Sequence, residues 1–98
     1  MSPSEMGEVT VQDNSDASRF ELRVDGELVS FADYIAHGDV LTVPHVETRR
    51  DLRGLGNADR LMKGMLDDIR ARGLRIEPVC SHARAYLRDH PEEADVVA

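Results

Sequence analysis

Apolar residues in this 98-residue chain change their spacing near Leu52, and this change limits how the chain can fold. In the segments before Leu52, apolar and polar residues tend to alternate, which is the period of a half-buried strand. From Ala58 to Ile69 the apolar residues recur every three or four positions instead. That spacing predicts one amphipathic helix of about five turns, so the chain should place strands first and a long helix after them.

Three strands are expected to form a β-meander before the helix, after a short first strand at residues 8–11. Alternation predicts strands at residues 19–24 and 27–31, and the Asp25-Gly26 pair between them is a strong hairpin signal. The turn His37-Gly38-Asp39 leads into a further strand at residues 40–46. Pro44 has no N–H to donate, so it marks a strand end, an edge or a bulge.

After the long helix, Gly73 suits a left-handed helix stop. A short strand at residues 74–79 and a short helix at residues 82–88 are then expected, the helix ending before His90-Pro91. The predicted order is meander, long helix, strand and short C-terminal helix. We expect one domain over residues 8–98, preceded by a disordered tail at residues 1–7.

The composition and charge of the chain limit which ligands and partners it can bind. No apolar run approaches the ~20 residues of a membrane span, and Cys80, the one cysteine, cannot form an internal disulfide, so we expect a cytoplasmic protein. The formal net charge of -7 argues against binding to nucleic acid or to anionic membranes. Residues 49–84, however, carry nine basic and five acidic side chains, so a small anion is a plausible partner. The histidines lack metal-ligand spacing, so no metal is expected.

Residues 53–58 read Arg-Gly-Leu-Gly-Asn-Ala at the start of the predicted helix. Small residues there let a phosphate approach the unpaired backbone N–H groups of the first helical turn. A P-loop is excluded because no Gly-Lys-Ser/Thr follows, and a dinucleotide fingerprint is excluded because Asp59 stands where its last Gly or Ala belongs. A glycine-rich turn without a ligand is the remaining alternative.

The spacing Arg53-x-x-Gly56-x-Ala58, after a strand and before a long helix, resembles the acetyl-coenzyme A signature R/Q-x-x-G-x-G/A of the GNAT acetyltransferases. The order of segments further resembles the small single-domain YjdJ-type subfamily of GNAT-like proteins. The similar segments cover most of the chain after residue 18 and include Pro44-His45-Val46-Glu47 and Pro78-Val79-Cys80.

This resemblance implies a mixed α+β domain whose central strands, ending at Val46 and Cys80, splay apart around the pantetheine arm of acetyl-CoA. Exposed strand backbone would pair with that arm, as an added strand would. The pyrophosphate would lie on the N–H groups of residues 53–58, with Arg53, and Arg49 or Arg50 as further candidates, adding charge. The implied coenzyme contacts are Val46, Glu47, Thr48, Arg53, Gly54, Leu55, Gly56, Asn57, Ala58 and Tyr86.

His45 and Cys80 are the candidate catalytic residues, because they end the two strands that flank the implied gap. Deprotonating an amine near neutral pH requires a base, and histidine titrates in that range. Glu47 is the second candidate base. Cys80 could act as a nucleophile, as a proton donor to the leaving thiolate, or as a pocket lining.

The implied activity is acetyl transfer from acetyl-CoA to a primary amine, and the acceptor, a small molecule or a protein lysine or N-terminus, is not specified by the sequence. A non-catalytic module that binds coenzyme A or acyl-CoA is the first alternative. A scaffold protein that uses exposed sheet edges is the second.

Overall fold

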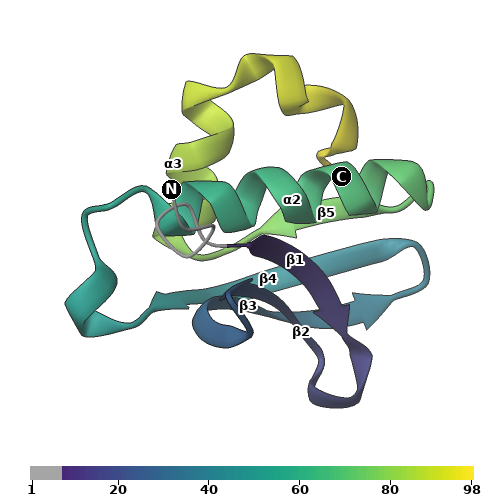
Figure 1. Cartoon of the computed structure of the whole chain (residues 1–98). Coiled ribbons are helices and arrows are strands. Elements are labelled where there is room, and N and C mark those ends of the chain that lie inside the picture. The colour runs from purple at the N-terminus through teal and green to yellow at the C-terminus, as the bar shows by residue number, and fades with distance from the viewer. Residues whose placement is uncertain (1–7) are drawn as a thin grey trace.

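The computed structural model describes residues 8–98, and the predicted tail at residues 1–7 lies outside the described residues. Five strands form one sheet in the order β1-β2-β3-β4-β5. Helices α2 and α3 both lie on one face of this sheet (Figure 1). The predicted α+β order of meander, long helix, strand and short helix is confirmed.

Four of the strands form an antiparallel meander, and the fifth joins it in parallel. Their bounds are β1 Val9–Asn14, β2 Arg19–Val24, β3 Glu27–His37, β4 Val40–Thr48 and β5 Arg75–Pro78. The β2–β3 hairpin turns at Asp25 and Gly26, which have φ angles of 52° and 85°. Positive φ at both central residues is the backbone of a type I′ turn, so the hairpin prediction is confirmed.

Strand β4 is longer than predicted because it stays paired with β3 beyond Pro44. Asp33 pairs with His45 and Ile35 pairs with Thr42, so β4 carries one residue more than β3 between these pairs. Pro44 lies in this irregular stretch, which makes it a bulge residue and not the end of the strand. Pairing then resumes and continues to Thr48.

Helix α2, Asn57–Ala71, packs its apolar stripe onto the sheet. Its fifteen residues make about four turns, one fewer than predicted. A separate 3-10 turn, Arg50–Leu52, precedes the loop that leads into the helix. The buried stripe consists of Leu61, Met62, Met65, Leu66 and Ile69. The helix stops where predicted, with Gly73 at a φ of 69°.

Gly64 allows helix α2 to lie close to strand β1. A Cβ atom at this position would sit 2.6 Å from the Cβ of Val11, a contact that side chains do not make. Glycine in a helix interior costs about 1 kcal/mol relative to alanine, and here close packing on the sheet offsets that cost.

Helix α3, Ser81–Asp89, is followed by a 3-10 helix, Pro91–Val96, that the sequence analysis did not foresee. Another 3-10 turn, Ser15–Ala17, joins β1 to β2. The final segment is held to α2, since Arg70 forms ion pairs with Glu93 and Asp95. Glu93 is almost fully buried.

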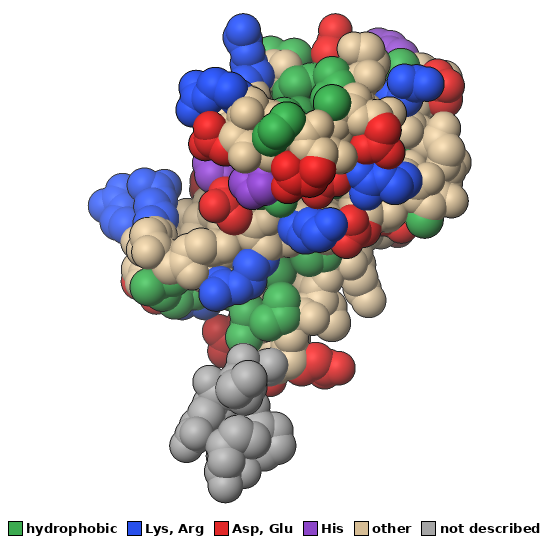
Figure 2. Space-filling view, turned by 90° about the horizontal axis from the view of Figure 1, so that it is seen from above, with side chains coloured by type: hydrophobic (Ala, Val, Ile, Leu, Met, Phe, Trp, Pro, Cys, Tyr) green, Lys and Arg blue, Asp and Glu red, His purple; other side chains and the backbone are tan. Residues whose placement is uncertain are grey.

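Acidic and basic side chains are interleaved on the helix-bearing side of the molecule (Figure 2). On α2, Lys63 pairs with Asp67, and Arg72 pairs with Asp68 and with Asp13 of β1. Together with the pairing of Arg70, these contacts neutralise most of the basic charge that the sequence places on this helix. Among residues 8–98, no helix is both long enough and apolar enough to cross a membrane.

Candidate active site

Strands β4 and β5 separate after a short paired stretch. Residues 40–43 pair in parallel with residues 75–78. At the end of this ladder the carbonyl oxygen of Val43 accepts hydrogen bonds from the N–H groups of both Val79 and Cys80, at 3.0 and 3.1 Å. Beyond this point β4 continues to pair with β3, whereas the chain that leaves β5 enters helix α3. We call the gap between these two diverging segments the fork, and it begins at Val43.

Beyond the bulge, some backbone N–H and C=O groups of β4 face away from β3 and toward this fork. In an antiparallel pair, residues that bond the partner strand alternate with residues that face away from it. The N–H of Arg49 donates to the carbonyl of Val29 of β3, so the alternate positions Val46 and Thr48 face away from β3. The carbonyl of Thr48 accordingly accepts a hydrogen bond from Nε of Arg53 at 3.2 Å.

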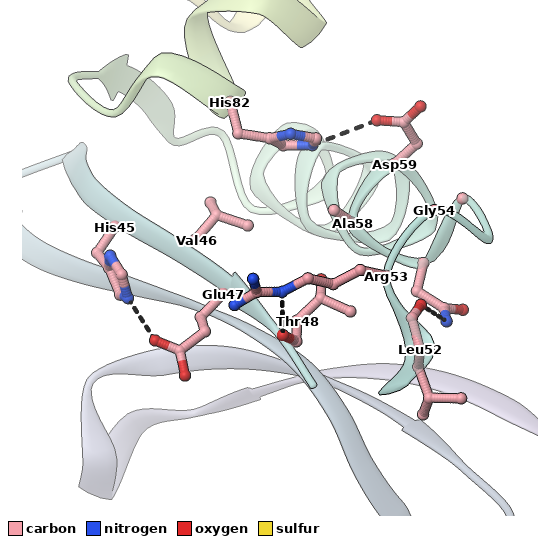
Figure 3. Close-up of a pocket in the computed structure, with 12 residues that line it drawn as sticks. His45, Val46, Glu47, Thr48, Leu52, Arg53, Gly54, Ala58, Asp59 and His82 are labelled. Carbon is pink, nitrogen blue, oxygen red and sulfur yellow. Dashed lines mark hydrogen bonds and ion pairs between the residues drawn. The ribbon is translucent and has the colours of Figure 1, made fainter. Parts of the chain in front are cut away.

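A groove of about 510 Å³ lies between β4 and the start of α2 (Figure 3). Leu52 and His82 of α3 complete its wall. Its lining consists of His45, Val46, Glu47, Thr48, Leu52, Arg53, Gly54, Gly56, Asn57, Ala58, Asp59 and His82.

The start of helix α2 lacks a side-chain cap. The N-cap residue is Gly56, whose φ of 82° lies in the left-handed region that glycine adopts without strain. The first intrahelical bond runs from the N–H of Arg60 to the carbonyl of Gly56. The N–H groups of Asn57, Ala58 and Asp59 have no hydrogen-bond partner within the described residues. Free donors of this kind, together with the positive end of the helix dipole, are the features that favour an anion at a helix start.

Residues 19–96 match the family described as GCN5-related N-acetyl-transferase. The chain belongs to this family. The Arg53-x-x-Gly56-x-Ala58 spacing, which resembles the GNAT signature, lies in the groove wall and at the uncapped helix start. No curated protein matches the sequence.

Two solved structures share the fold of this family member. The ribosomal-protein-S18-alanine N-acetyltransferase from Escherichia coli is 20% identical over 72% of this chain, with a TM-score of 0.61. A GCN5-like protein from Staphylococcus aureus is 18% identical, the match covering 93% of this chain and 87% of that protein, with a TM-score of 0.62. Our chain spans about half, 49%, of the E. coli protein.

The two candidate bases of the GNAT chain lie side by side on β4. Nε2 of His45 and Oε1 of Glu47 are 2.9 Å apart, and both side chains are about half exposed. The His45 ring also lies 6.0 Å from the ring of Phe31 on β3. His45 and Glu47 are alternative candidate bases in the sequence, whereas in the structure they form one hydrogen-bonded pair.

Cys80 is placed at the fork but is engaged in the local structure of α3. It is the N-cap residue of that helix, and its Sγ accepts a hydrogen bond from the N–H of Ala83 at 3.4 Å. Its side chain is not part of the groove lining given above. Cys80 therefore has a capping role whether or not it has a chemical one.

Leu55 and Tyr86 are not brought to the groove. Leu55 is exposed and lines a second cavity of about 480 Å³ on the other side of the loop, together with Val9. Tyr86 is 7% exposed and stacks on His90, with 3.9 Å between ring centroids. Burial, and next the carboxylate of Glu93, raise the pKa of Tyr86 above its usual value.

Of the predicted arginines, Arg53 lines the groove, whereas Arg49 and Arg50 do not. Arg49 is paired with Glu27 and Asp51, and these contacts raise its pKa further. Most of the predicted basic stretch is therefore unavailable to a ligand in the groove.

Three groove residues were not predicted as contacts from the sequence: Leu52, Asp59 and His82. Asp59 directly follows the signature, and His82 is the second residue of α3. Their approach depends on how α2 and α3 pack, which no local pattern encodes. Within residues 8–98, no three His, Cys, Asp or Glu side chains gather as a metal site.

Proposed function

We propose that this protein transfers an acetyl group from acetyl-CoA to a primary amine. The observation that carries the proposal is the groove, which combines a free β4 backbone edge with an uncapped helix start in a GNAT-family fold. Family membership supports acetyltransferase activity in general. The donor, the acceptor class and the residue roles below are parts of this proposal.

The groove residues fit the chemistry of coenzyme A. The free N–H groups of Asn57, Ala58 and Asp59 suit a pyrophosphate, and the guanidinium of Arg53 adds positive charge beside them. Backbone groups of Val46 and Thr48 suit the amides of a pantetheine arm, which would bind as an added strand. Arg53 must release the carbonyl of Thr48 for both contacts to form.

His45 acts as the base in this mechanism. Acetyl-CoA supplies an acetyl group already activated as a thioester. The acceptor nitrogen forms a bond to the acetyl carbon while the carbon–sulfur bond breaks, and the amine proton passes to His45. Glu47 holds the imidazole in place through the 2.9 Å contact and stabilises its protonated form. Phe31 restricts the ring from the neighbouring strand.

We favour direct attack over an acetyl-cysteine route. A thioester passed to Cys80 would gain almost no driving force, because one thioester would replace another. The Sγ of Cys80 is also occupied as a helix cap. In the direct route, Cys80, at the end of the β4–β5 ladder, would give its proton to the leaving thiolate of coenzyme A and recover a proton from solvent.

We propose a primary amine as the acetyl acceptor without naming one molecule. The E. coli relative is named for an alanine of ribosomal protein S18, and this chain spans about half of that protein. A protein N-terminus, a lysine side chain and a small amine are therefore all tested as acceptors. A cytoplasmic location belongs to the same proposal, and cell fractionation tests it.

Calorimetry with coenzyme A, followed by turnover with acetyl-CoA and a panel of amines, tests the proposal. Binding together with amine-dependent release of coenzyme A supports it. Binding without turnover on any amine would leave the non-catalytic coenzyme-binding module as the function. Failure to bind coenzyme A would overturn the assignment of the groove and favour the scaffold role.

A further inference from the structure

His82 and Asp59 meet across the upper side of the groove (Figure 3). Nε2 of His82 lies 3.3 Å from Oδ1 of Asp59. This nitrogen is shielded from solvent, yet no atom of the described residues reaches it in hydrogen-bonding geometry. The two side chains come from the first turns of different helices, Asp59 from α2 and His82 from α3.

Asp59 carries negative charge to the place where the proposed function needs positive charge. It lines the groove and is the third residue of α2, beside the free N–H groups. A carboxylate in the first helical turn is favourable for the helix, but it competes with and repels an anionic ligand at the same N–H groups. Uncompensated, Asp59 would weaken the binding of a pyrophosphate.

The arginine side chains nearby are directed elsewhere. Arg60 donates to the carbonyl of Leu55 and to Oδ1 of Asn57, on the side of the second cavity. Arg53 donates to the carbonyl of Thr48. Within residues 8–98, His82 is therefore the one basic side chain paired with Asp59.

A purely structural role for the pair has little support. The side chains are 40% and 61% exposed, and exposed ion pairs add little to stability. Their placement on the groove, where both could meet a ligand, calls for a different explanation. Among the described residues, Asp59 is the acidic side chain paired with Nε2 of His82, so the imidazole is placed to act on that carboxylate.

We propose that His82 is a positioning residue that offsets the charge of Asp59 and thereby sets the affinity of the groove for the phosphates of coenzyme A. This inference rests on the proposed function and adds a determinant that lies outside the Arg53-x-x-Gly56-x-Ala58 signature. His82 acts through Asp59, so its importance depends on the carboxylate being present.

A double-mutant cycle on the full chain tests this dependence, with coenzyme A as the calorimetric probe. We expect His82→Ala to weaken binding about threefold to tenfold and Asp59→Asn to leave binding equal or tighter. In the Asp59→Asn background, His82→Ala should change the dissociation constant by less than about twofold. His82→Arg, which places a permanent positive charge beside Asp59, should bind coenzyme A at least as tightly as the wild type.

Kinetics and thermal unfolding separate this role from a structural one. We expect His82→Ala to raise KM for acetyl-CoA while changing kcat by less than about twofold, because the pair is not at His45. His82→Ala should leave the melting temperature unchanged both in the wild-type background and in the Asp59→Asn background. His82→Gln is a second variant in case the alanine variant fails to fold.

Three results would overturn the inference. An equal loss of affinity in both backgrounds would mean that His82 contacts the ligand directly, and no loss in either would mean that the pair is irrelevant to binding. A loss that follows the melting temperature would mean that the pair is structural. Failure of the wild type to bind coenzyme A would overturn the proposed function as well, so the two failures are distinguishable.

Discussion

A buried polar group in the antiparallel half of the sheet is fully paired, whereas polar groups at the fork lack partners. Glu21 on β2 is 5% exposed and accepts hydrogen bonds from Asn14, Arg19 and Arg23. Burial alone would raise its pKa, but these three donors outweigh burial and hold the pKa below its usual value. The chain can therefore satisfy a buried charge within its own fold.

The fork presents the opposite condition. Within the described residues, the first N–H groups of α2 and Nε2 of His82 have no hydrogen-bond partner, although helix α3 beside them is capped by Cys80. Unpaired polar groups reduce stability unless a ligand or water completes them. Their concentration at one groove supports the proposal that this part of the molecule binds the ligand. Substitutions in the antiparallel half should thus change stability, and substitutions at the fork should change binding or rate.

The largest expected effect at the fork comes from His45→Ala. Loss of the base should lower kcat by about 100-fold or more, while affinity for coenzyme A and the melting temperature stay unchanged. His37→Ala, at the exposed end of β3, is the matched control. A steady-state assay with a saturating amine measures the effect, and an unchanged kcat would remove His45 from the mechanism.

Glu21→Gln should have the largest effect in the antiparallel half. Replacing the carboxylate leaves Arg19 and Arg23 without their charged acceptor, so the free energy of unfolding should fall by about 2 kcal/mol near neutral pH. Coenzyme affinity should not change. Urea unfolding measures the loss, and Glu92→Gln, at an exposed site, is the control.

The same variant has a defined pH dependence. Because the pKa of Glu21 is lowered in the folded state, its carboxylate stabilises the fold at pH values above the unfolded-state pKa. That contribution is lost as the pH falls through the folded-state pKa. The difference in unfolding free energy between wild type and Glu21→Gln should therefore shrink in acid, and a constant difference would contradict this explanation.

Ala58→Leu should weaken coenzyme binding by about tenfold or more, because a larger side chain in the groove blocks approach to the N–H groups of the first turn. The helical backbone accepts leucine, so the fold should persist. Ala71→Leu, an exposed change at the other end of α2, is the control. Gly56→Val would be a poorer test, since its φ of 82° strains any β-branched residue. Equal affinities for the two leucine variants would exclude the helix start as the phosphate site.

The smallest expected effect belongs to Cys80→Ala. Removing the cap of α3 should lower stability by about 1 kcal/mol or less and change kcat by less than about fivefold. Cys80→Ser keeps a capping atom and should retain the stability. Mass spectrometry of the wild type with acetyl-CoA alone provides the decisive result: an acetyl-Cys80 that a later amine discharges at the turnover rate would establish the cysteine route instead.

Local patterns predicted much of the fold because their causes are local. The Asp25-Gly26 turn, the apolar stripe of α2 and the stop at Gly73 each depend on neighbouring residues, and each is confirmed. The signature loop at residues 53–58 was likewise found before the helix that it opens. In each of these features, residues close together in the sequence determine the geometry.

Contacts between distant segments could not be predicted in the same way. The pairing of Arg70 with Glu93 links residues 23 positions apart and fixes a C-terminal segment that lacks a clear period. The approach of His82 to Asp59 likewise depends on how two helices pack. The excess of basic residues in 49–84 overestimated the positive charge open to a ligand for the same reason. The sequence does not show that Arg49 and Arg72 are already paired with acidic side chains.

A titration of the isotope-labelled protein with coenzyme A, followed by backbone amide NMR, tests most directly whether the fork is the binding site. We expect the largest shifts at the amides of Val46, Thr48 and residues 56–59, and little change at Glu21 or along β1. Shifts centred on Val9 and Leu55, at the second cavity, or the absence of any shift would contradict the account.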